Sequence, residues 1–136
     1  MEGEISEEKI EEYARGWEKK IQKKEAARRK RVRHAREKAE AIAELAFDSY
    51  RVDEVWIFGS LARKKMRKNS DLDLMISGLS PEKYWSFLTE AEKIASPFKI
   101  DIVLKEEASR AFKKRVRREG VKLKDEEKNL DPKSRS

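Results

Sequence analysis

The chain contains 136 residues, of which 45% are charged and 38% are hydrophobic. A chain of this length supports one small hydrophobic core, and the charged fraction requires that part of it stays in solvent. It contains no cysteine and a single histidine, His34. This composition excludes disulfides, thiol nucleophiles and zinc sites built from cysteine or from several histidines. Any bound metal must therefore be held by oxygen atoms.

The net charge is +7, but it is unevenly distributed along the chain. Residues 1–18 carry seven acidic and two basic side chains, whereas residues 19–38 carry two acidic and eleven basic ones. The basicity is therefore mostly one block about twenty residues long. No run of about 18 apolar residues is present, and the first residues are acidic where a secretory signal would be basic. We expect a soluble, cytoplasmic protein without a membrane segment.

The first 50 residues are predicted to form a charged helical arm. From Ser6 to about Phe47 there is no proline and one glycine, Gly16, and the composition favours helix. Ser6 is placed to cap the helix, with Glu7 and Glu8 in the first turn, where the helix dipole favours acids. The pattern predicts one long helix or two stacked ones.

Apolar residues recur along this arm at steps of three and four, as a packing seam requires. They are Ile10, Ala14, Trp17 and Ile21, and then Val32, Ala35, Ala39, Ile42 and Ala46. A continuous helix of about 42 residues would be about 63 Å long, which exceeds the width of a small domain. Such a rod must protrude, fold back or pair with another chain.

Residues 51–123 read as a compact domain of the α/β (α+β) class, because short apolar runs alternate with helical patterns. Strands are expected at 53–59, 71–77 and 98–105, and helices at 60–66, 81–95 and 107–118. Residues 124–136 are almost free of apolar side chains and are predicted to be a disordered tail.

Acidic and apolar residues alternate in two of the expected strands. Asp71 and Asp73 alternate with Leu72 and Leu74, so the carboxylates share one face of the strand, and Asp101 repeats the arrangement in a later strand. If these strands are neighbours, three carboxylates face one pocket. Their mutual repulsion would require a cation, and Mg²⁺ takes carboxylate and phosphate oxygens. The pattern therefore indicates a magnesium and nucleotide site.

Upstream, the apolar run 55–58 ends in Gly59 and Ser60, and a basic segment that includes Arg63 follows. A strand that turns through Gly-Ser presents backbone N–H groups and a hydroxyl to an anion. This turn is a candidate phosphate site.

Together, Gly59-Ser60, ten intervening residues, Asp71-Leu72-Asp73 and a later Asp101 resemble the minimal nucleotidyltransferase (MNT) family of the DNA polymerase β-like superfamily. The resemblance covers about residues 52–123. One departure is Lys64, where the family commonly has glycine, so the exit from the short helix that follows the turn is expected to differ.

The resemblance implies a small mixed β-sheet flanked by helices, the nucleotidyltransferase fold. It also implies that ATP or another nucleoside triphosphate binds with two Mg²⁺ ions and that a nucleoside monophosphate is transferred to a hydroxyl. Asp71, Asp73 and Asp101 would hold the ions, and Asp101 would also serve the attacking hydroxyl. Gly59 and Ser60 would hold the terminal phosphates with support from Arg63.

The resemblance further suggests an MNT-type antitoxin of a toxin–antitoxin system, which would transfer AMP to a hydroxyl, typically of a tyrosine, on a HEPN-type protein partner. The alternative is a catalytically idle nucleotide-binding MNT domain that acts as a protein- or nucleic-acid-binding module through its arm. For the arm itself, three partners remain open: nucleic acid, an acidic protein, or a second copy in antiparallel self-association. Nucleic acid is slightly the least favoured, because the acidic and basic blocks complement each other.

Overall fold

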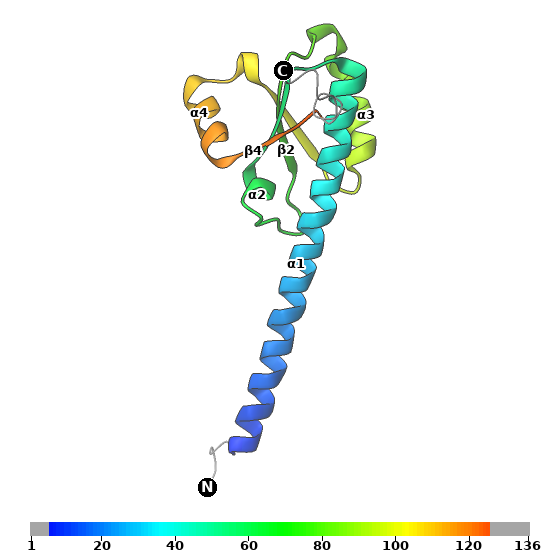
Figure 1. Cartoon of the computed structure of the whole chain (residues 1–136). Helices are drawn as coiled ribbons and strands as arrows, with labels where there is room; N and C mark the ends of the chain where they lie inside the picture. The colour runs from blue at the N-terminus through cyan, green and yellow to red at the C-terminus, as the bar shows by residue number, and fades with distance from the viewer. Residues whose placement is uncertain (1–5, 126–136) are drawn as a thin grey trace, which may run out of the picture.

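The computed structural model describes residues 6–125 and shows a four-stranded sheet with helices packed around it (Figure 1). The helices are α1 (Glu7–Tyr50), α2 (Gly59–Ala62), α3 (Tyr84–Ala95) and α4 (Arg110–Glu119). The strands are β1 (Glu54–Phe58), β2 (Leu72–Ser77), β3 (Ile100–Leu104) and β4 (Val121–Leu123). The strand order is β3-β2-β1-β4, with β2 and β3 parallel and the other pairs antiparallel. The expected mixed sheet with flanking helices is thus confirmed.

The N-terminal segment is a single uninterrupted helix, α1, rather than two stacked ones. The Ser6 hydroxyl accepts a hydrogen bond from the backbone N–H of Lys9 at 3.3 Å, as a helix N-cap does. At the other end, Arg51 adopts a left-handed conformation and closes the helix. Every residue from 6 to 30 is exposed, and this half of α1 extends as a rod beyond the domain (Figure 1).

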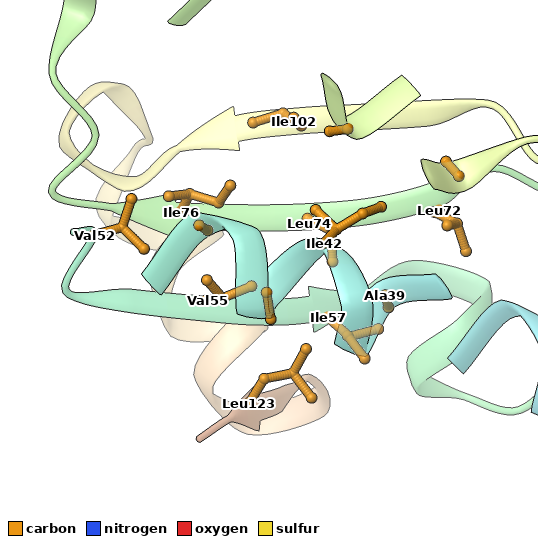
Figure 2. Packing of buried hydrophobic residues seen from close by; sticks show 14 of the residues in the cluster. Ala39, Ile42, Val52, Val55, Ile57, Leu72, Leu74, Ile76, Ile102 and Leu123 are labelled. Carbon is orange, nitrogen blue, oxygen red and sulfur yellow. The ribbon is translucent and has the colours of Figure 1, made fainter. Parts of the chain in front are cut away.

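The second half of α1 belongs to the hydrophobic core. Ala35, Ala39, Ile42 and Ala46 are fully buried against the sheet, and α3 packs beside them. Figure 2 shows Ala39 and Ile42 close to the side chains of Ile57 and Leu74, and the same buried cluster includes Val55 and Ile76. Alanine at three of the four α1 positions lets the helix lie close to the strands. The division expected at residue 50 stays a prediction, and α1 takes part in both the arm and the core.

Four elements differ from the sequence-based expectation. Helix α3 begins at Tyr84 rather than 81, because residues 81–83 form a separate 3-10 turn. Strand β4 was not predicted, because its three residues, two apolar ones on either side of Lys122, are too few to show a strand pattern. Helix α2 spans four residues instead of 60–66, since Lys64 takes a left-handed conformation (φ 56°) that ends it. Helix α4 begins at Arg110 rather than 107, because the Ser109 hydroxyl accepts from the Phe112 N–H at 3.1 Å and caps it there.

Two expectations concern the chain ends and the membrane. Residues 126–136, most of the predicted disordered tail, lie outside the described residues. Within residues 6–125, no helix is both long and apolar enough to cross a bilayer. The expected cytoplasmic location stays a prediction.

Candidate active site

The sheet brings two of the predicted carboxylates together. In β2, Leu72 and Leu74 are buried toward α1, so Asp73 projects from the opposite face and is half-buried. The parallel pairing of β2 with β3 sets Asp73 in register with Asp101, which is exposed on the same face. Neighbouring strands lie about 4.8 Å apart, so the two carboxylates project side by side. The condition that the two strands be neighbours is therefore met.

Asp71 lies one residue before β2 and is exposed. Its charge still acts on Asp73. The pKa of Asp73 is raised from 3.8 to about 6, mainly by burial and to smaller extents by the charges of Asp101 and Asp71, while Arg63 opposes the rise. Asp73 is therefore a carboxylate whose negative form is disfavoured until a positive charge approaches it.

The Gly59 turn lies directly against Asp73. Residue 58, the last of β1, pairs with Asp73 across the antiparallel ladder, and Gly59 follows with φ +72°. A Cβ at this position would overlap the Oδ2 atom of Asp73. Glycine is thus required twice, for the left-handed backbone and for the close approach of the carboxylate. Ser60, the next residue, is partly exposed beside the acidic pair.

A cavity of about 210 Å³ is lined in part by the Gly59 turn. Its lining includes Gly59, Arg63, Phe58 and, from α4, Phe112 and Arg115. The rings of Phe58 and Phe112 meet edge to face with centroids 5.2 Å apart. The sequence analysis missed the contribution of α4. The sequence did contain a signal for it, because Phe112 and Val116 are four residues apart in an otherwise basic helix and so lie on one apolar face.

The chemistry of the acidic face fits a hard divalent cation such as Mg²⁺. All candidate ligands are carboxylate oxygens, and the charges of Asp101 and Asp71 add to burial in raising the pKa of Asp73, so a cation would relieve their mutual repulsion. Among residues 6–125, however, no group of three carboxylate or imidazole side chains is already arranged to hold a metal ion. Asp71 and Asp101 are exposed, so packing does not oppose rotation of their side chains toward Asp73.

Residues 40–129 of the sequence match the family model described as polymerase beta, nucleotidyltransferase. The match begins inside α1, so residues 7–39 lie outside it. No curated protein matches the chain significantly.

Several solved structures share the fold. A structure described as a minimal nucleotidyltransferase aligns with a TM-score of 0.58 and 26% identity, over 68% of this chain and 95% of that chain. A toxin–antitoxin complex with AMP-PNP aligns with a TM-score of 0.52 and 20% identity, over 68% and 78%. A mutant of the toxin–antitoxin pair MntA-HpeT has a TM-score of 0.52 and 18% identity, with the same coverage.

Proposed function

Because this chain belongs to the polymerase beta nucleotidyltransferase family, we propose that it transfers a nucleoside monophosphate, AMP from ATP, to a hydroxyl group of a partner protein. The observation that carries the proposal is the in-register pair Asp73 and Asp101 beside the Gly59 turn. Two adjacent carboxylates next to a partly exposed Gly-Ser turn suit a triphosphate that arrives with divalent cations.

Each residue of this face has a role in the proposal. Asp71, Asp73 and Asp101 would hold two Mg²⁺ ions, which supply charge neutralisation for the triphosphate and a lower pKa for the attacking hydroxyl. The Ser60 hydroxyl and the Gly59 N–H donate hydrogen bonds to the terminal phosphates, and the Arg63 guanidinium adds positive charge close to them.

The proposed transfer is a displacement at the α-phosphorus of the triphosphate. A bond forms between the acceptor oxygen and the α-phosphorus, and the bond from that phosphorus to the bridging oxygen breaks, so that pyrophosphate leaves. Asp101 is exposed on the same face as Asp73, so its carboxylate is accessible to accept the proton of the hydroxyl.

We place the acceptor on a HEPN-type toxin, with this chain as the MNT-type antitoxin. The support is that two similar structures are toxin–antitoxin complexes and that one of these contains the ATP analogue AMP-PNP. The acceptor group we expect is a tyrosine hydroxyl.

The test is label transfer from ATP carrying a radioactive α-phosphate, with Mg²⁺ and a candidate HEPN partner. Asp73→Asn should reduce the transfer at least about a hundredfold, and a chelator should abolish it. Asp48→Asn, which changes an exposed carboxylate on the last turn of α1, is the matched control and should leave transfer unchanged. Equal transfer by the two variants would exclude Asp73 from the site.

A catalytically idle, nucleotide-binding domain is the second candidate. It is favoured by the absence, among residues 6–125, of a carboxylate group already arranged for metal. Calorimetric titration of ATP with Mg²⁺ separates the two candidates when it is combined with a pyrophosphate assay. Binding without pyrophosphate release in the presence of any tested acceptor supports the idle domain, whereas release supports the transferase.

A further inference from the structure

The exposed part of α1 carries an apolar stripe that nothing in the described residues covers. The relative exposure is 54% for Ile10, 77% for Tyr13, 57% for Trp17 and 41% for Ile21. These positions follow the same three- and four-residue steps as the buried alanines farther along the helix, so the stripe faces the same side of α1 that packs on the sheet. Large apolar residues at this spacing are typical of a helix that packs against another helix.

A basic groove lies where this stripe meets the domain. It has a volume of about 320 Å³ and lies between α1, α2 and the β1–β4 edge. The apolar part of its lining is Val32, Ile57, Leu61, Ala62 and Val121, and the cations around it are Arg28, Arg29, Arg33, Arg36 and Lys64. Within residues 6–125, only Arg36 among these cations forms an ion pair, with Glu40 at 3.0 Å. The groove thus combines an apolar lining with uncompensated positive charge.

We propose that this groove receives the N-terminal part of α1 from a second copy of the chain, a surface that plays no part in the proposed transfer reaction. That part of the helix has the complementary chemistry. Its apolar residues Ile10 and Tyr13 match the apolar lining, and its acidic residues match the arginines. These acids are Glu7, Glu8, Glu11 and Glu12.

The register follows from this match. If Ile10 of one copy lies at the level of Val32 of the other, the helices run antiparallel and the two-fold axis passes near Ile21, midway between them. In that register the acidic residues Glu11, Glu12 and Glu18 lie level with basic ones. Their counterparts in the second copy are Arg31, Lys30 and Lys24, in that order.

The symmetry of this pairing closes the assembly at two copies, because each arm fills the groove of the other. A parallel pair would instead set acid against acid and base against base, which opposes association. Nucleic acid fits the groove less well, since phosphates would satisfy the arginines but leave the apolar lining exposed.

A charge-swap experiment tests the pairing with the full chain, by light scattering coupled to gel filtration. One variant carries Glu11→Lys, Glu12→Lys and Glu18→Lys, and the other carries the reverse changes at their counterparts, Arg31→Glu, Lys30→Glu and Lys24→Glu. The wild type should be a dimer, and each variant alone should dissociate at least about tenfold more readily because like charges then face each other. An equimolar mixture of the two variants should recover the wild-type dimer.

Because the chain has no cysteine, single cysteines report the two-fold axis directly. Ile21→Cys should form a disulfide-linked dimer under mild oxidation, since a residue near the axis meets its own copy within the reach of a disulfide. Lys19→Cys, on the opposite side of the helix, is the control and should remain monomeric on a denaturing gel.

The outcomes that overturn the proposal are a monomeric wild type, no recovery of the dimer in the mixture, or equal cross-linking at the two positions. RNA binding by a monomeric wild type that is lost when the groove residues Arg28, Arg29 and Arg33 are replaced by glutamate would assign the groove to nucleic acid instead.

Discussion

The two halves of α1 share one apolar spacing but differ in what the stripe meets. In the half that packs on the sheet, the stripe is mainly alanine with Ile42 and is fully buried. In the half that extends beyond the domain, the stripe carries isoleucine, tyrosine and tryptophan, and all of these are exposed. Small residues suit contact with a broad sheet at close range, and large ones suit contact with another helix. The periodicity alone therefore predicts a packing face without saying which partner covers it.

Removing an isoleucine side chain from each half of α1 should give the largest difference in the free energy of unfolding. Ile42→Ala leaves a cavity in the core and should lower the free energy of unfolding by about 3 kcal/mol. Ile21→Ala removes the same atoms from an exposed position. It should change the free energy of unfolding by less than about 0.5 kcal/mol at dilutions where the chain is monomeric. Urea denaturation followed by circular dichroism measures both. Similar losses would show that the arm is packed within a single chain.

Glycine gives a second contrast between the domain and the arm. Gly59→Ala forces a methyl group onto the Asp73 carboxylate and strains a left-handed backbone, so we expect a loss of about 2 kcal/mol in stability together with loss of nucleotide transfer. Thermal melting and the label-transfer assay measure the two effects. Unchanged transfer by this variant would contradict the close packing of the turn on the acidic residue.

A third contrast concerns charge. The folded-state pKa of Asp73 is raised to about 6 from 3.8, so ionisation of this group opposes folding at neutral pH. Without metal, wild-type stability should therefore rise as the pH falls from about 7 toward 4. Asp73→Asn should remove this dependence and stabilise the metal-free chain at pH 8 by about 2 kcal/mol, allowing for partial exposure.

Melting temperatures in a chelator across this pH range check the prediction. Glu12→Gln, an equivalent change on the exposed arm, should leave the pH dependence unaltered. Mg²⁺ should raise the melting temperature of the wild type and have little effect on Asp73→Asn. A wild type that loses stability on mild acidification would contradict the expected direction.

The smallest expected effect is in the arm. Gly16 has open space around the position of a Cβ, so Gly16→Ala introduces no clash and should stabilise the helix locally by about 1 kcal/mol. At dilutions where the chain is monomeric, hydrogen exchange of the amides in residues 7–30 should slow about fivefold, whereas the amides of the sheet should be unaffected. Equal exchange in the two proteins at these dilutions would contradict the expected gain in helix stability.

The strands that carry the acidic residues could be predicted from the sequence because of period-two alternation. Asp73 lies between two buried leucines, and Asp101 lies between the half-buried Ile100 and the buried Ile102, which is the alternation typical of a strand. The adjacency of their strands could not be derived from the pattern, because strand pairing joins residues far apart in the chain and alternation within one strand does not determine it.

Other features depended on local conformations that side-chain type does not determine. The early end of α2 depends on the positive φ of Lys64, a conformation for which the residue itself gives no signal. The contribution of Phe112 to the cavity beside Gly59 depends on where α4 returns to the sheet. The continuity of α1 could be predicted only as one of two outcomes, since no breaker separates its halves but nothing in its composition forbids a fold-back.

Because α1 is uninterrupted from Glu7 to Tyr50, the helix also acts as a spacer of fixed length between its two ends. A molecule bound at Trp17 is held about 37 Å from Ile42, at a fixed rotational angle about the helix axis. Inserting one residue between these positions would shift that molecule by about 1.5 Å and rotate it by about 100°, whereas inserting seven would move it by about 10 Å and nearly restore its angle. The length and phase of this helix therefore set where a partner lies relative to the acidic face of the sheet.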